Sequence, residues 1–130
     1  MTKRDIESHL DLVTTLDPLR RTATGTGASV DLQGYDSAMA VFHAGLWVDG
    51  THTPKLQDSA DGTTFADAGT ADQLGTFAAV LGTATDQIIQ KVGYIGDKQF
   101  VRGFVTVAGA TTGADYGFTI VRGHAHRQPL

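Results

Sequence analysis

The sequence contains no cysteine, so neither a disulfide framework nor a thiolate metal site can form. Stability must therefore come from the burial of apolar side chains. The chain also lacks a continuous apolar run of about 18 residues, the length that spans a bilayer. Its first ten residues, MTKRDIESHL, lack the apolar block of a signal peptide. We expect a chain that is made in the cytoplasm and has no membrane partner.

Charged side chains are scarce as well. They make up 18% of the chain, and the formal net charge is −4. A surface that binds nucleic acid or an anionic membrane needs an excess of positive charge, so neither partner is expected. The 16 glycines, together with many Ala and Thr residues, instead indicate short strands, tight turns and surfaces that face other protein.

The sequence from Ser29 to the end, 29–130, has the pattern of one all-β domain. The stretch Val92 to Val107, VGYIGDKQFVRGFVTV, contains the clearest strand, with large apolar side chains on both faces. Such a strand is usually central and covered on each side. Turn signals recur about every 8–12 residues, which favours a single antiparallel β-sandwich or jelly roll. The predicted strands are 30–33, 37–48, 51–57, 76–81, 87–92, 99–107 and 115–121.

Local turn signals also predict how these strands pair. Asp49-Gly50 is a hairpin signal that should send residues 51–57 back beside the preceding strand. Pro54 cannot donate to a ladder, which suggests that the returning strand lies at an edge. A short turn from Ala108 to Gly113 should place the last strand beside the central one.

Residues 1–28 differ from the rest and have the composition of an N-terminal arm with a flexible connector. Apolar residues recur at helical spacing between Asp5 and Thr14, which allows a short amphipathic helix, although they also allow an extended arm. Asp17-Pro18 ends this segment, and the connector is TATGTGA, residues 22–28. Such an arm packs on something else; a partly ordered terminus is the alternative. Its apolar residues are Ile6, Leu10, Leu12, Val13 and Leu16.

Three groups of residues have a weak likeness to functional sites. Asp58-x-x-Asp61-Gly62 has some features of a calcium loop, but the alternating ligands and the final Glu are missing, and a turn explains the same residues. His124-x-His126 supplies two imidazoles without a third ligand. Trp47 with Tyr35 and Tyr94 could form a sugar-stacking platform, although core and subunit contacts are commoner for such residues. We therefore expect no metal site and no cofactor.

Four segments of the chain carry a resemblance to one family. The segments are VDLQGYDSAMAVFHAG, VDGTHTPKLQDSADGTTFAD, QKVGYIGDKQFVRGFVTVAGATTGADYG and GHAHRQP. Together they extend over roughly residues 10–130 and resemble a group of small proteins from tailed-phage and prophage genomes, often encoded near the major capsid protein. Members with an assigned role look like virion structural proteins, either head decoration (cement) proteins or bases of head spikes and fibres. No catalytic motif carries over, and we expect no enzyme.

The resemblance implies a capsid decoration protein on the virion surface that binds the outside of the major capsid protein lattice and stabilises the head. The alternative is a head-spike or fibre base or adaptor, with carbohydrate binding as one variant. A homotrimer on a symmetric lattice would make several contacts at once, so a homotrimer is the expected assembly. Contacts with the capsid or between subunits are expected from Ile6, Leu10, Leu12, Val13, Leu16, Arg20, Arg21 and Trp47.

Overall fold

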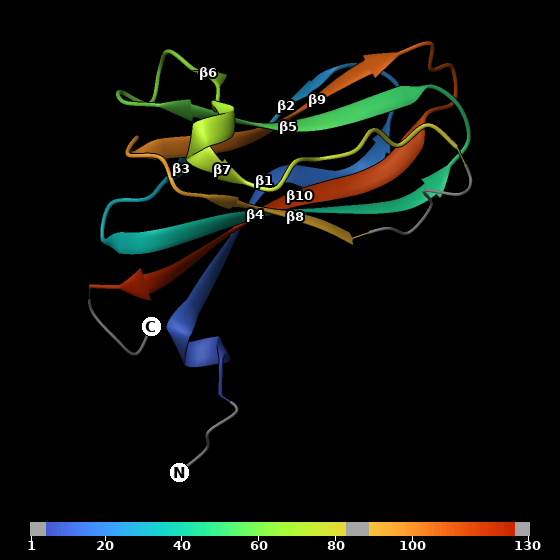
Figure 1. The fold of residues 1–130 in the computed structure, drawn as a ribbon. Coiled ribbons are helices and arrows are strands. Elements are labelled where there is room, and N and C mark those ends of the chain that lie inside the picture. Colours follow the sequence, from blue (N-terminus) through green and yellow to red (C-terminus); the bar gives the residue numbers. More distant parts are fainter. Residues whose placement is uncertain (1–4, 83–88, 127–130) are drawn as a thin grey trace.

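Two antiparallel β-sheets pack face to face in the computed structural model, which describes residues 5–82 and 89–126 (Figure 1). The prediction of an all-β sandwich is confirmed. The first sheet has the order β1 (Leu10–Arg21), β10 (Ala114–Ala125), β4 (Tyr35–Trp47), β8 (Ile89–Tyr94) and β7 (Gln73–Leu74). The second sheet has the order β2 (Gly25–Thr26), β9 (Phe100–Ala108), β5 (Thr51–Ser59) and β6 (Ala66–Asp67), and β3 (Val30–Asp31) also pairs with β9. Two short 3-10 helices are η1 (Glu7–His9) and η2 (Thr70–Asp72).

The core lies between the sheets and follows from the alternation of side chains along each strand. β10 directs Tyr116, Phe118 and Ile120 inward, and each is almost fully buried. Burial of one such side chain contributes about 1.5–3 kcal/mol. The facing position on β9 is Gly103, where an added Cβ would lie 2.6 Å from the Phe118 ring. A glycine is therefore required at this position, because the ring fills the space that a side chain would need.

The stretch Val92 to Val107 is divided between the two sheets. Its first part belongs to β8 in the first sheet, whereas β9 is an interior strand of the second sheet. Val101 and Val105 of β9 are buried as expected. The other face of β9 is covered by single side chains: Lys55 Nζ lies 4.8 Å from the Phe104 ring centroid, and the Arg102 guanidinium lies 4.1 Å from that of Phe65. β9 is therefore a central strand as predicted, but its outer face is covered by single side chains and not by a second sheet.

Both predicted hairpins are crossings between the sheets instead. After Asp49-Gly50 the chain leaves the first sheet, and β5 pairs with β9 rather than with β4. After residues 108–113 it crosses back, so the last strand pairs with β1 and β4. The Asp49 carboxylate fixes both crossings, because it accepts hydrogen bonds from the backbone N–H groups of Thr111, Thr112 and Gly113.

The expected arm is largely a strand of the sandwich. Beyond the single turn of η1, residues 10–21 form β1, which pairs with β10 along the edge of the first sheet. Leu16 is 3% exposed in the core, and Thr15 Oγ1 joins the sheets by donating to Ala28 O at 2.5 Å and accepting from the Gly103 N–H at 3.1 Å. Of the two predicted alternatives, the extended one is therefore correct from Leu10 onward and the helical one is not. Because this segment is a strand of the sandwich, it does not form an arm separate from a domain at 29–130.

The sides of the sandwich are closed as well. After β6 the chain crosses to the first sheet at β7, and farther along, the backbone of Val80 exchanges two hydrogen bonds with that of His52 on β5. The predicted strand 76–81 is reduced to this isolated bridge, and the first residues of the predicted strand 87–92 lie outside the described residues. β6 pairs with β5 only at Gln57 and Asp58, and the Val80 bridge meets β5 at His52, so the buried Pro54 lies between them at a position of β5 that needs no backbone donor.

Candidate functional site

The outer face of the first sheet carries exposed apolar side chains. Residues directly opposite one another in neighbouring strands point to the same side of a sheet, and three such rows lie on the side that faces away from the core. Here we call these three rows the apolar face. The rows are Leu12–Val121–Met39–Gly93–Leu74, Thr14–Thr119–Val41–Lys91 and Gly117–His43–Ile89.

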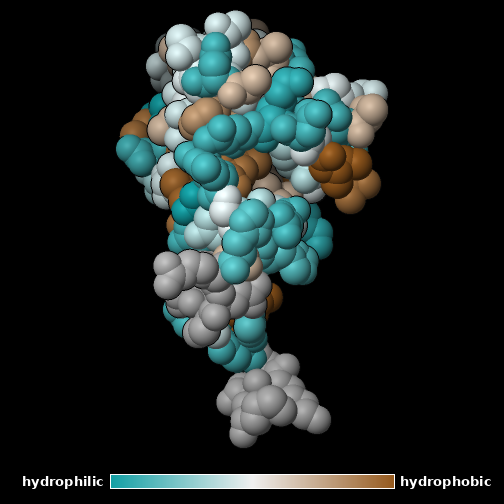
Figure 2. Space-filling model, turned by 90° about the vertical axis from the view of Figure 1, so that its left-hand side faces the viewer, coloured by the Kyte–Doolittle hydropathy of each residue, from teal (hydrophilic) through white to brown (hydrophobic). Residues whose placement is uncertain are grey.

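Several apolar side chains on this face are largely uncovered. Leu12, Leu74 and Ile89 are 63%, 62% and 64% exposed. Ile95, which follows β8, is also mostly exposed. In Figure 2, which views one end of the molecule, hydrophobic residues protrude as a group at one edge of a largely hydrophilic surface. Exposed apolar side chains that gather on one face of a protein mark candidate interaction sites.

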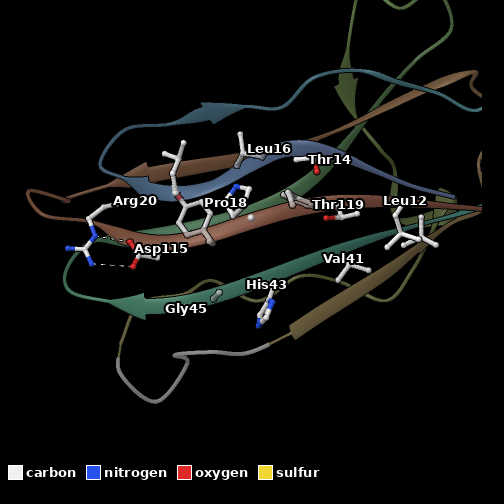
Figure 3. A pocket seen from close by; sticks show the side chains of 16 residues that line it. Leu12, Thr14, Leu16, Pro18, Arg20, Val41, His43, Gly45, Asp115 and Thr119 are labelled. Atoms are coloured by element: carbon white, nitrogen blue, oxygen red, sulfur yellow. Dashed lines mark hydrogen bonds and ion pairs between the residues drawn. The ribbon is translucent and has the colours of Figure 1, made fainter. Parts of the chain in front are cut away.

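A groove of about 670 Å³ runs along the apolar face between β1 and β4 (Figure 3). Gly45, Gly117 and Thr119 are among its lining residues, and Leu12 lies at one end. The groove exists because β1 departs from regular pairing: its register with β10 shifts between Thr14 and Leu16 and again between Leu16 and Leu19. Such bulges bend a strand away from its partner. The result is a hollow lined mainly by small and apolar groups.

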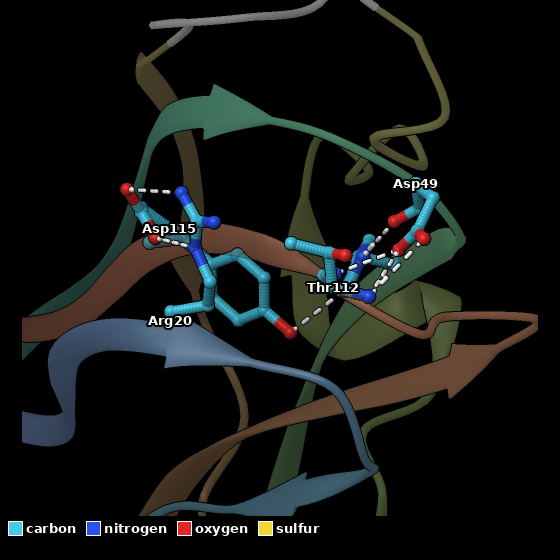
Figure 4. Close-up of polar contacts among 7 residues, drawn as sticks. Arg20, Asp49, Thr112 and Asp115 are labelled. Atoms are coloured by element: carbon cyan, nitrogen blue, oxygen red, sulfur yellow. Dashed lines mark hydrogen bonds and ion pairs between the residues drawn. The ribbon is translucent and has the colours of Figure 1, made fainter.

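The other end of the groove is closed by an ion pair (Figures 3 and 4). Arg20 Nε lies 2.8 Å from Asp115 Oδ1, and Arg20 Nη2 lies 3.3 Å from Asp115 Oδ2. This hydrogen bonding lowers the pKa of Asp115 and raises the pKa of Arg20. Both groups are solvent-exposed, so the pair adds little stability. As a result, the positive charge of Arg20 and the negative charge of Asp115 neutralise each other at this end of the apolar face.

The buried polar groups in the core have structural partners. His52 is fully buried; Nε2 lies 3.0 Å from Asp49 O, and Nδ1 lies 3.0 Å from the Tyr116 hydroxyl. A carbonyl can only accept, so Nε2 carries the proton and Nδ1 accepts from Tyr116. Burial raises the pKa of Tyr116 to about 12. These hydrogen bonds therefore hold the two sheets together.

The calcium-like sequence around Asp61 forms a turn. Asp61 Oδ1 accepts hydrogen bonds from the Thr63 and Thr64 N–H groups and from Ser59 Oγ. These donors lower the pKa of Asp61 to about 2, because they stabilise the charged carboxylate. Within residues 5–82 and 89–126, no cluster of three or more His, Asp or Glu side chains could hold a metal ion. The interpretation of this segment as a turn is confirmed.

The C-terminal histidines lie beside the start of β4. His124 Nδ1 is 2.8 Å from Ser37 Oγ, and His126 Nε2 is 2.8 Å from Asp36 Oδ1. His124 has a φ of 51°, a left-handed conformation that is uncommon for a residue with a side chain. The two imidazoles therefore have different partners instead of converging on one point.

The three aromatic residues considered for sugar stacking do not form a platform. Trp47 packs against the core, and its Nε1 donates to Gly50 O at 2.8 Å. Tyr94 is buried, and its hydroxyl donates to Asp58 Oδ2 at 2.9 Å. The Arg122 guanidinium covers the Tyr35 ring at 4.4 Å from the centroid. The sugar-platform alternative is therefore wrong, because each ring already has a partner within the protein.

The predicted contact residues differ in how far the fold buries them. Leu16 is buried in the core, so it is not free to contact another protein, whereas Val13 and Trp47 are partly buried against the core. Arg21 is half-buried, and its Nη2 donates to Asp17 O at 3.0 Å. Ile6, Leu12 and Arg20 are exposed at the surface, and Leu10 is half-buried like Arg21.

Sequence reasoning missed the residues that β4, β7 and β8 contribute to the apolar face. These include Val41, Leu74 and Ile89. A signal was present, because the strand predicted at 37–48 has apolar residues on both faces. A half-buried strand that packs on one side only should instead alternate apolar with polar residues.

Comparison with protein families, with curated proteins and with solved structures finds no match to this chain. Among the helices in the described part of the chain, none has the length and apolar character needed to span a bilayer.

Proposed function

We propose that the protein is a phage capsid decoration (cement) protein that binds the outside of the major capsid protein lattice and stabilises the head. The observation that carries the proposal is the position of the exposed apolar side chains. They lie on the outer face of one sheet and at the N-terminal end, on the outside of a closed sandwich. This arrangement suits protein–protein contact, and the resemblance to phage virion proteins supplies the class of partner.

The N-terminal end is the surface we assign to the capsid. Figure 1 shows η1 and the start of β1 projecting beyond the body of the two sheets. Ile6, just before η1, is 64% exposed, and Leu10 begins β1 at the same end. Burial of apolar surface against the capsid would contribute about 25 cal/mol per Å². A single end of this size binds weakly, and repetition over a symmetric lattice would strengthen the binding.

A binding experiment with capsids that lack the protein tests the proposal. The full chain is mixed with such capsids and sedimented, and the thermal disruption of the shells is measured. We expect saturable co-sedimentation and a higher disruption temperature. Ile6→Glu should weaken binding at least about tenfold, since it would place a charge in an apolar contact. Leu81→Glu is the matched control, because Leu81 is 58% exposed but belongs neither to the N-terminal end nor to the apolar face.

Two results would contradict the proposal. The first is a folded protein that never sediments with capsids. The second is equal binding by the wild type and Ile6→Glu, which would remove the N-terminal end from the contact. Binding confined to capsid vertices would instead support the alternative of a head-spike or fibre base.

A further inference from the structure

We propose that Arg102, on the outer side of the second sheet, is the centre of a site that binds a carboxylate of a partner protein. The inference goes beyond capsid decoration, because it concerns a different surface and a contact that needs no capsid. In Figure 1 the second sheet lies on the far side of the molecule from η1. The N-terminal end and the Arg102 site can therefore be occupied at the same time.

Arg102 lies on the outward side of an interior strand. Burial alternates along residues 100–105 of β9, where every second residue is buried and the residues between them are half-buried. Side chains two positions apart share a face of a sheet, so Phe100 and Phe104 lie on either side of Arg102. Gln57 lies directly opposite Arg102 on β5. The guanidinium is therefore held among two phenylalanines and a glutamine.

Three contacts fix the position of this guanidinium. Its central carbon lies 4.1 Å from the Phe65 ring centroid, and its Nε donates to Gln57 Oε1 at 2.8 Å. Gln57 is itself 8% exposed, and its Nε2 donates to Asp67 Oδ1 at 3.0 Å. Because these contacts already restrict the Arg102 side chain, the binding of a ligand would cost little further side-chain entropy.

The charge of Arg102 has no carboxylate partner in the part of the chain that the structure describes. The Asp67 carboxylate is bridged to Arg102 only through the Gln57 amide, and it is already paired with Lys55 Nζ at 3.1 Å. An amide accepts the hydrogen bond without neutralising the cation. Other cations of the chain do have carboxylate partners, in the pairs Arg20–Asp115, Lys55–Asp67, Lys98–Asp97 and Arg122–Asp11.

The two Nη groups of Arg102 determine the chemistry of the ligand. Neither donates a hydrogen bond to any described residue, because the Arg102 hydrogen bond is made by Nε. Two parallel N–H groups on this edge match the two oxygens of a carboxylate. The chain has a net charge of −4 and therefore repels a polyanion. A single carboxylate matches the single unpaired charge.

The rings beside Arg102 favour a protein as the source of this carboxylate. Arginine and aromatic residues are enriched where protein interfaces hold most of their binding energy, and apolar contacts there exclude water from the charged pair. Phe100 and Phe104 are half-buried, so each ring keeps some surface for such a contact. An Asp or Glu flanked by apolar side chains fits this arrangement, with its carboxylate on Arg102 and its neighbours on the rings.

Nuclear magnetic resonance of the full ¹⁵N-labelled chain tests the inference. A capped peptide in which Glu alternates with Leu is titrated into the protein, and the Arg102 Nε–H signal is followed. The same peptide with Gln in place of Glu is the neutral probe, and an oligomer of galacturonate supplies carboxylates on a sugar. We expect saturable shifts with the Glu peptide, none with the Gln peptide, and at least about tenfold weaker binding of the oligouronate.

Substitutions then test the role of the guanidinium. Arg102→Gln should raise the dissociation constant of the Glu peptide at least about tenfold, because it removes charge-assisted hydrogen bonds. Arg102→Lys should also weaken binding, since an ammonium keeps the charge but cannot hold two oxygens in the same way. Arg20→Gln is the matched control, because Asp115 already neutralises Arg20. It should bind like the wild type, and urea denaturation checks that each variant is folded.

Several results would overturn the inference. One is the absence of any shift at Arg102 with the Glu peptide, and another is binding by Arg102→Gln or Arg102→Lys that is as tight as that of the wild type. Equal binding of the Gln peptide or the oligouronate would also contradict it, as would an equal loss in Arg20→Gln. None of these measurements includes capsids, so they are distinct from a failure of capsid binding, which is tested with Ile6→Glu.

Discussion

His52 connects the two sheets at the level of a single side chain. It lies on β5 in the second sheet and pairs with Tyr116 of β10 in the first, and the Asp49 carbonyl satisfies its other nitrogen. A buried donor or acceptor that loses its partner costs about 1–3 kcal/mol. The ring therefore matters for the hydrogen bonds that it makes as well as for the volume that it fills.

We predict that His52→Phe lowers the free energy of unfolding by about 2–4 kcal/mol, because it leaves the Tyr116 hydroxyl and the Asp49 carbonyl without a partner. Tyr116→Phe should cost about 1–2 kcal/mol, since one nitrogen of His52 loses its donor. Urea denaturation measures both. The double variant should lose less free energy of unfolding than the two single variants lose together. If the losses are strictly additive, the two side chains do not interact.

β1 is the element whose role changes most between sequence and structure. Its apolar residues fit helical spacing, but they form a bulged edge strand whose inward residues, Val13 and Leu16, join the core. Alternation was hard to recognise because each bulge inserts a residue and reverses the sides. Pro18 then suggested an end to the segment, although an edge strand tolerates proline.

We predict that removal of residues 1–9 leaves the sandwich folded, whereas removal of residues 1–20 unfolds it. The longer deletion takes away most of β1, including Leu16 and the Thr15 hydroxyl that joins the sheets. Leu16→Ala should cost about 2–5 kcal/mol, and Ile6→Ala should cost less than about 0.5 kcal/mol. Circular dichroism and urea denaturation measure these effects. A folded chain without residues 1–20 would contradict the placement of β1.

The elements also show which parts of the fold local sequence can encode. β4 and β9 occupy Tyr35–Trp47 and Phe100–Ala108, close to the predicted ranges, because alternation is a local property of each strand. Pairing is not local. Asp49-Gly50 is compatible with a hairpin and with a crossing, and the deciding interaction is between Asp49 and residues 111–113, more than sixty positions away.

For the whole molecule, acid stability should depend on turn and surface carboxylates. Hydrogen bonds from backbone N–H groups lower the pKa of Asp49, and those from Thr64 and Thr63 lower the pKa of Asp61 to about 2. A folded-state pKa below the unfolded value of about 3.9 gives stability that is fully present above about pH 4. That stability is lost as the pH falls towards the folded value.

We therefore predict that the free energy of unfolding falls between about pH 4 and pH 2. Asp61→Asn should reduce this loss, because Asn cannot be protonated in that range. Urea denaturation across the acid range measures the effect, and Asp97→Asn is a control at an exposed acidic side chain. Equal acid sensitivity of the wild type and Asp61→Asn would show that the turn carboxylate does not carry the effect.

The candidate surfaces of the whole molecule were only partly predictable. Ile6, Leu10, Leu12 and Arg20 were identified from sequence, but they were assigned to an arm with no defined shape. The apolar face needs β1, β10, β4, β8 and β7 side by side, and their order follows from pairing between distant segments. Exposed apolar residues on β8 and β7 therefore could not be assigned to the same surface as Leu12 from sequence.

The decoration of the phage head that we propose is tested most directly by the number and position of copies of the protein in a density map of the intact particle. We predict hundreds of copies spread over the capsid lattice, with the N-terminal end against the major capsid protein. Absence from the particle, or copies at the vertices alone, would contradict this proposal.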